Sequence, residues 1–107
     1  MERGKEAATP PVSRYTVAFM PDAEEDLTAL PRKIQEQIGR AIDAKLAVAP
    51  DRLGKRLTQS LTGLWRVRSG DYRIAYTLDP EKRAVTIWAI RHRKEIYPKL
   101  ERRWMRR

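Results

Sequence analysis

The stretch LWRVRSGDYRIAYTL, residues 64–78, is typical of two β-strands joined by a tight turn. Apolar and polar side chains alternate on either side of Ser69-Gly70-Asp71, and this tripeptide is itself a hairpin signal. The alternation predicts one strand over Leu64–Arg68 and a second over Tyr72–Leu78. We therefore expect the fold to be organised around an antiparallel hairpin.

The register of this hairpin follows from its apolar residues. Alternation puts Trp65 and Val67 on one face of the first strand. Ile74 and Tyr76 likewise share one face of the second strand. A turn at residues 70–71 sets Val67 opposite Ile74, and all four side chains then enter the core together.

The same register collects three arginines on the other face of the hairpin. Arg68 falls directly opposite Arg73, and Arg66 lies two residues along on the same side. Like charges in opposed positions destabilise a sheet by a few tenths to about 1 kcal/mol. The planar guanidinium fork, in contrast, binds phosphate through paired hydrogen bonds. This arginine face (Arg66, Arg68 and Arg73) therefore indicates either a phosphate-binding surface or a solvated basic face whose side chains splay apart.

Downstream of the hairpin, a turn at residues 79–82 precedes a third strand over Ala84–Ile90. A short basic and aromatic segment follows that strand, with Arg91, His92, Arg93, Lys94 and Tyr97. Residues Pro98–Arg107 predict a short basic helix, because Leu100 and Trp104 lie one helical turn apart.

Upstream of the hairpin, the pattern predicts a strand, two helices and a loop. Tyr15–Phe19 alternates as a strand does, whereas apolar residues within 21–30 and 34–46 recur with helical spacing. Pro31 separates the two helices, since proline is tolerated in a first turn but not in a helix interior. Residues 51–63 indicate a loop.

The element order defines the expected architecture. Residues 1–13 are polar and predict a disordered N-terminal extension, which leaves residues 14–107 as one domain. The order strand–helix–helix–strand–strand–strand indicates an α+β fold. We expect the two N-terminal helices to cover one face of a mainly antiparallel four-stranded sheet, with a short C-terminal helix at the end.

Composition narrows the chemistry. A net charge of +9 predicts attraction to nucleic acid or to an acidic protein. The chain has no cysteine and one histidine, which excludes thiolate catalysis and multi-histidine metal sites. We expect no metal and no other cofactor. No apolar run approaches the roughly 20 residues of a membrane span, and the N-terminus lacks an apolar signal core, so a cytoplasmic protein is expected.

Two segments carry a family signature: GLWRVRSGDYRIAY, residues 63–76, and IRHRKEIY, residues 90–97. Together they resemble RelE-type toxins of the RelE/ParE superfamily. That family's pattern is a glycine, a strand with alternating basic residues, a Gly-Asp-Tyr-Arg hairpin and a basic stretch ending in tyrosine. The similarity covers roughly Arg14 to Tyr97, and it implies a single RelE-like domain over residues 14–107.

The resemblance implies a function. RelE-like members are toxins of type II toxin–antitoxin systems and cleave messenger RNA in the ribosomal A site. A 2′-hydroxyl attacks the adjacent phosphodiester without metal, and translation stops. The implied partners are a cognate antitoxin, the ribosome and messenger RNA, with the toxin a monomer inside a hetero-oligomeric complex.

The resemblance also implies site residues. Carried over by position, the catalytic set is Arg66, Arg68, Arg73, Arg93 and Tyr97. Arg91 replaces Arg93 if the segment after the last strand is aligned without a gap. The residues expected to bind RNA are Lys55, Arg56, Arg91, His92 and Lys94.

Two questions stay open at this level. Related toxins often carry lysine where this chain has Arg66 and Arg68, and arginine effectively cannot lose its proton. The general base is therefore either His92, whose ordinary pKa suits the task, or absent, with the arginines promoting the 2′-hydroxide electrostatically. The second question is activity: alternatives to the ribonuclease are a ParE-like toxin that poisons DNA gyrase, and a basic module that binds only its antitoxin.

Overall fold

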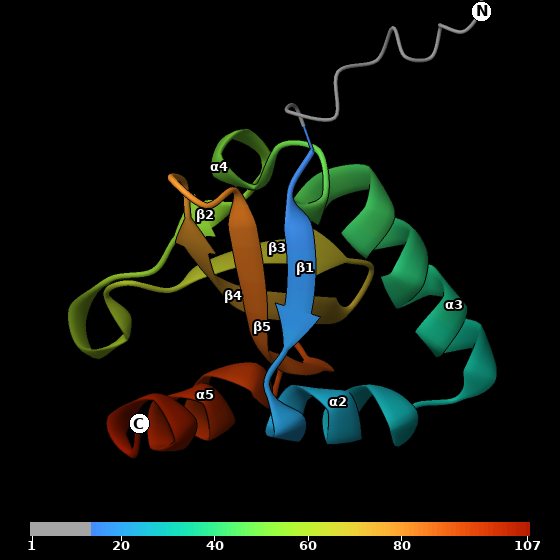
Figure 1. The fold of residues 1–107 in the computed structure, drawn as a ribbon. Coiled ribbons are helices and arrows are strands. Elements are labelled where there is room, and N and C mark those ends of the chain that lie inside the picture. The colour runs from blue at the N-terminus through green and yellow to red at the C-terminus, as the bar shows by residue number, and fades with distance from the viewer. Residues whose placement is uncertain (1–13) are drawn as a thin grey trace, which may run out of the picture.

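The computed structural model describes residues 14–107, so the predicted disordered extension over residues 1–13 lies outside the described residues (Figure 1). The described chain is an α+β domain, as predicted. One five-stranded sheet runs in the order β1-β5-β4-β3-β2. The strands are β1 (Thr16–Phe19), β2 (Lys55–Arg56), β3 (Trp65–Ser69), β4 (Tyr72–Asp79) and β5 (Ala84–His92).

The central hairpin has the predicted register. Val67 pairs with Ile74, and Arg68 pairs with Arg73, in antiparallel β3 and β4. Gly70 has a φ of 61° at the turn, in the left-handed region that glycine tolerates best. A Cβ on Gly70 would lie 2.9 Å from Nε2 of Gln37, the atom that donates hydrogen bonds to Ser69. The outer side of the turn is therefore covered by helix α3 (Arg32–Ala41).

The predicted four-stranded sheet is wrong by one strand. The region 51–63, expected to be a loop, contains β2, which pairs Lys55 with Arg66 antiparallel to β3. A strand of two residues is too short to give an alternating pattern, so periodicity does not reveal it. At the opposite edge β1 pairs with β5 in parallel, which makes the sheet mixed.

The helices differ modestly from expectation. They are α2 (Pro21–Thr28), α3 (Arg32–Ala41), a π-helical segment η2 (Ile42–Leu46), α4 (Pro50–Leu53), a 3₁₀ turn η3 (Gln59–Leu61) and α5 (Ile96–Met105). The predicted second helix is thus α3 continued by η2, while α4 and η3 arise in the expected loop. Helix α5 begins at Ile96, not at Pro98, because proline in a first turn gives up no intrahelical hydrogen bond.

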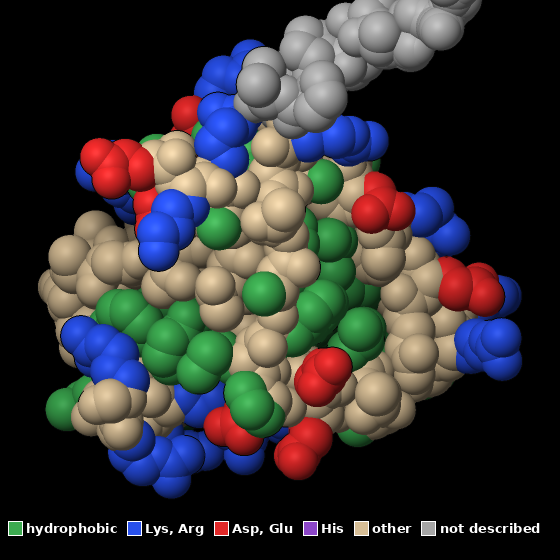
Figure 2. All heavy atoms as spheres, in the orientation of Figure 1, with side chains coloured by type: hydrophobic (Ala, Val, Ile, Leu, Met, Phe, Trp, Pro, Cys, Tyr) green, Lys and Arg blue, Asp and Glu red, His purple; other side chains and the backbone are tan. Residues whose placement is uncertain are grey.

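Apolar clusters lie on both faces of the sheet. Helices α2, α3 and η2 cover the predicted core face, where Val67, Ile74 and Tyr76 are buried. Helix α5 covers the other face, with Leu100 and Trp104 in a second cluster. Apolar side chains also remain visible on either side of β1 in Figure 2, where edge strand β1 is only half covered. Helix α5 therefore shares its sheet face with the three arginines.

Candidate functional site: an arginine face on the sheet

The arginine face is present in the structure as the hairpin register predicts. Arg66 lies on β3 opposite Ala75 of β4, and Arg68 lies opposite Arg73. Arg68 is exposed, whereas Arg66 and Arg73 are half-buried. Among residues 14–107, none of these three arginines forms an ion pair with a carboxylate. Three positive charges therefore stand together without a carboxylate partner in the described chain.

Arg73 is the centre of this cluster. Its NH1 atom donates to the carbonyl oxygens of Gly70, at 3.0 Å, and Tyr72, at 3.1 Å, which fixes the guanidinium beside the turn. Partial burial lowers the pKa of Arg73, and the charges of Arg68 and Arg66 lower it further. The Arg73 guanidinium stays protonated. Its lowered pKa indicates that positive charge is unfavourable at this position, which favours the binding of an anion there.

Arg93 and Tyr97 complete the predicted catalytic set. The backbone N–H of Arg93 donates to the carbonyl of Asp71 at 2.7 Å, and its Nε lies 3.5 Å from the Asp71 carboxylate. These contacts hold Arg93 at the hairpin tip. Tyr97 lies in the first turn of α5 and is 39% exposed. Both side chains are near enough to Arg73 to shift its pKa, Tyr97 upward and Arg93 downward.

The residues expected to bind RNA divide into two groups. Lys55 is exposed and pairs with Arg66, so alternation places it on the arginine face. Lys94 is exposed between Arg93 and Tyr97. Arg56 pairs with Trp65 instead, and its guanidinium lies 5.1 Å from that ring, on the opposite face of the sheet.

His92 also lies away from the arginine face. It pairs with Tyr72, and the two rings meet edge to face with centroids 5.6 Å apart. Tyr72 packs against the core under α2 and α3, so His92 shares that face. Its Nδ1 accepts a hydrogen bond from the backbone N–H of Lys94 at 3.2 Å. A neutral His92 therefore carries its proton on Nε2 and has no spare lone pair with which to act as a base.

Arg91 is held by carboxylates. It is the strand partner of Arg73, but its side chain binds Asp26 of α2 at 3.2 Å and Glu95 at 3.4 Å. Of the two arginines that the family alignment offers, the structure brings Arg93 to the arginine face and ties Arg91 to Asp26.

Sequence reasoning missed Asp26 and its second partner, Arg103 of α5. A signal was present: Asp26 lies three residues after Ala23 and four before Leu30, within the apolar stripe of that helix. The spacing of Leu100 and Trp104 predicts the C-terminal helix, and the structure adds an ion pair of 2.7 Å between Arg103 of α5 and Asp26.

Two features are absent from the described residues. Within residues 14–107 no group of three or more His, Cys, Asp or Glu side chains is arranged to hold a metal ion. No helix in that range combines the length and apolar character needed to cross a membrane.

The fold and the basic sheet face define a class, the small basic α+β domains, and comparison with known proteins gives the family. The family model described as "ParE toxin of type II toxin-antitoxin system, parDE" matches residues 17–97. Toxin RelG of Mycobacterium tuberculosis (strain ATCC 25618 / H37Rv) is 37% identical over 83 residues, covering 78% of this chain and 95% of RelG. Toxin RelE of the same organism is 39% identical over 83 residues, covering 78% of this chain and 86% of RelE. The chain belongs to the ParE toxin family of type II toxin–antitoxin systems, and the predicted RelE/ParE membership is confirmed.

Solved structures agree with this placement. The toxin–antitoxin complex RelBE2 from Mycobacterium tuberculosis aligns with a TM-score of 0.70 and 35% identity, over 74% of this chain and 98% of that one. The isolated E. coli RelE toxin aligns with a TM-score of 0.61 over 83% of this chain and 97% of that one. Its identity of 20% supports the fold alone.

Proposed function

We propose that this chain is a ribosome-dependent endoribonuclease toxin that cleaves messenger RNA without a metal ion. The observation that carries the proposal is the convergence of Arg66, Arg68, Arg73, Arg93 and Tyr97 on one end of one sheet face. This is the set that the family resemblance assigns to catalysis.

The chemistry follows from fixed positive charge. Attack of a 2′-hydroxyl on the adjacent phosphodiester concentrates negative charge on the nonbridging oxygens. Arg73, held by two backbone carbonyls, and Arg93, held at the hairpin tip, are positioned to stabilise that charge. Tyr97 offers a partly exposed ring on which a base can stack.

In this proposal no side chain acts as the base: the 2′-hydroxyl proton passes to water, and the arginine face stabilises the resulting oxyanion. The P–O5′ bond breaks as the 2′,3′-cyclic phosphate forms, and the leaving 5′-oxygen takes a proton from water. The position and tautomer of His92 argue against its acting as the base. In this proposal the ribosome orients the messenger RNA, so the arginine face does not itself need to enclose the substrate. This mechanism predicts activity in excess EDTA on a substrate whose presentation does not itself require magnesium.

The alternative is a ParE-like toxin that poisons DNA gyrase and cuts no RNA. The family model that matches the chain is named for ParE toxins, and this match is the observation that supports the alternative. Primer extension on messenger RNA after induced expression, with a gyrase supercoiling assay beside it, separates the two. Discrete cuts within translated regions support the ribonuclease, whereas inhibited supercoiling with intact messenger RNA supports the gyrase poison.

We also propose a cognate antitoxin and action in the cytoplasm, where ribosomes are found. Structural neighbours include RelB–RelE complexes. A surface this basic fits an antitoxin with a flexible segment of acidic and apolar residues that folds on binding. Stopped-flow association with the product of the neighbouring gene should slow markedly as salt rises, while dissociation changes far less. An on-rate indifferent to salt would remove the electrostatic argument.

A further inference from the structure

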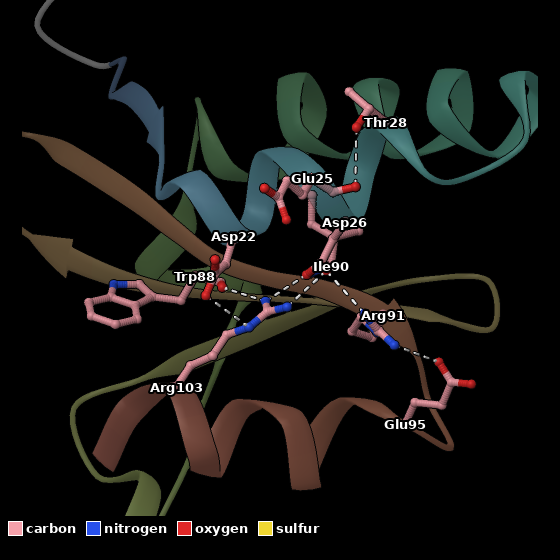
Figure 3. Close-up of polar contacts among 9 residues, drawn as sticks. All are labelled: Asp22, Glu25, Asp26, Thr28, Trp88, Ile90, Arg91, Glu95 and Arg103. Carbon is pink, nitrogen blue, oxygen red and sulfur yellow. Dashed lines mark hydrogen bonds and ion pairs between the residues drawn. The ribbon is translucent and has the colours of Figure 1, made fainter. Parts of the chain in front are cut away.

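A buried carboxylate lies behind the arginine face. The Asp26 side chain is 3% exposed, and four donors surround its two oxygens (Figure 3). Oδ2 accepts from the backbone N–H of Ile90 at 3.0 Å and from NH1 of Arg103 at 2.7 Å. Oδ1 accepts from NH2 of Arg103 at 2.9 Å and from NH1 of Arg91 at 3.2 Å. Arg103 thus binds the carboxylate in a bidentate manner, through both terminal nitrogens of its guanidinium group.

The charges around Asp26 alternate in sign. Arg91 continues to Glu95 at 3.4 Å, and Arg103 continues to Asp22 at 3.6 Å (Figure 3). We call these five residues, Asp22, Asp26, Arg91, Glu95 and Arg103, the Asp26 network. It joins helix α2, the end of strand β5, the turn after β5 and helix α5. Helix α2 is therefore tied through one carboxylate to residues that lie 65 and 77 positions later in the sequence.

The network closes the edge of β5 at the point where β1 stops. Strand β1 pairs with β5 only as far as Ile87, and helix α2 then begins. Beyond that point Asp26 accepts from the N–H of Ile90, and Arg103 donates to the carbonyl of Trp88 at 3.1 Å. Two side chains thus replace a neighbouring strand and fix the segment that leads to Arg93.

The network also removes one positive charge from the arginine face. Arg91 is the strand partner of Arg73, so alternation alone would direct both guanidinium groups to the same face. Asp26 draws Arg91 to the sheet edge, where its side chain is 28% exposed. Arg93, two residues on, is left as the member of this segment that lies beside Arg73.

We propose that Asp26 is a positioning residue for RNA cleavage, which acts through Arg91 and Arg103 to set Arg93 and Tyr97 against Arg73. It touches no RNA: its carboxylate is enclosed, and both oxygens are occupied. Arg103 holds α5, on which Tyr97 lies, and the Ile90 and Arg91 contacts hold the end of β5, from which Arg93 extends. The inference rests on the proposed ribonuclease activity.

The first test is single-turnover cleavage of messenger RNA on purified ribosomes by Asp26→Asn. The maximum rate should fall about 10- to 100-fold, since misplacement of catalytic groups by an ångström costs up to about 100-fold. The ribosome concentration that gives half the maximum rate should change less than about twofold, because the surface that binds ribosome and RNA keeps its charges.

Val85→Ala is the matched control. Val85 is buried on the same strand as Arg91 but at its opposite end, so its truncation lowers stability without touching the network. Both variants are compared at a temperature where circular dichroism shows them folded. Equal losses of rate in the two variants would overturn the positioning role, and so would a wild-type rate in Asp26→Asn.

If Asp26→Asn does not fold, Arg91→Gln takes its place in the test. In Arg91→Gln the Asp26 carboxylate still accepts hydrogen bonds from Arg103 and from the Ile90 N–H. A positioning role predicts a lower maximum rate and, where both single variants fold, no further loss in the double variant. The opposite result is a raised half-saturating ribosome concentration in Arg91→Gln, together with a loss of rate in the double variant equal to the product of the two single losses. That result would mean that Arg91 contacts RNA, and it would overturn the proposal. A wild-type protein that cuts no RNA would instead contradict the proposed function.

Discussion

Arginine serves two opposite purposes in this molecule. In the Asp26 network two arginines are matched with carboxylates, and the central pair is almost fully shielded from water. On the arginine face three arginines stand together, without a carboxylate partner among residues 14–107. The paired arginines stabilise the fold. The unmatched ones destabilise it slightly and favour an anion. The two groups of arginines therefore differ in their partners and not in residue type: those with carboxylate partners belong to the fold, and those without are the candidate site.

The largest expected effect comes from removing the main partner of Asp26. Arg103→Met leaves the buried carboxylate with Arg91 as its one charged partner, beside the Ile90 N–H, and should lower the free energy of unfolding by about 3–5 kcal/mol. Urea unfolding followed by circular dichroism measures the change. Arg102→Met, an exposed neighbour on the same helix, serves as the control and should stay within about 0.5 kcal/mol of wild type. Similar losses in both variants would mean that the network contributes little.

The second prediction concerns the arginine face. Arg73→Ala and Arg93→Ala should each reduce cleavage by roughly 100- to 1,000-fold, or about 3–4 kcal/mol of transition-state stabilisation. Both variants should stay folded, because each substitution removes one positive charge from a cluster of like charges. Cleavage on programmed ribosomes and a thermal melt measure the two quantities, with Lys82→Ala in the turn between β4 and β5 as the control. Full activity in both variants would place the site elsewhere.

Lowering the pH should weaken the Asp26 network, because its carboxyl groups take up protons, while the arginine face keeps its charge. Burial alone would raise the pKa of Asp26, but hydrogen bonds from Arg103 and Ile90 outweigh it and hold the pKa below the ordinary value of 3.8. The stability that Asp26 contributes is therefore complete above about pH 4 and is lost as pH falls through the lowered pKa. Asp22, Glu25 and Glu95 are the other carboxyl groups around this site.

Urea unfolding from pH 6 down to pH 2 tests this prediction. Wild type should lose stability below pH 4 by more than Asp26→Asn does, because the variant lacks the titrating carboxyl. Parallel curves for the two proteins would show that Asp26 does not contribute to the acid dependence.

The smallest effect should have the opposite sign. Arg68→Gln relieves a directly opposed pair of like charges and should raise the free energy of unfolding by a few tenths to about 1 kcal/mol at low salt. The gain should shrink as salt screens the repulsion. Urea unfolding in a salt series measures it. A loss of stability would mean that Arg68 makes a favourable contact in the free protein.

The contrast also explains what the sequence could predict. The hairpin and the arginine face follow from alternation within fifteen consecutive residues, so local pattern suffices. The choice between Arg91 and Arg93 does not, because it depends on Asp26, 65 residues away from Arg91. Strand β2 was missed because two residues carry no period. The roles of Arg73 and Tyr97 in catalysis stay predictions until the cleavage assays are done.

The distance between Asp26 and its partners has a consequence for how the chain folds. Helix α2 is synthesised early, but its carboxylate meets Arg91 and Arg103 only after 65 and 77 more residues have been made. Contacts of such long sequence separation form late, because a large loop must close first. A nascent chain that ends before Arg103 thus buries Asp26 without its main partner and has no docked α5 to carry Tyr97. Under the proposed function, Arg93 and Tyr97 therefore reach their places beside Arg73 only after this last helix has docked.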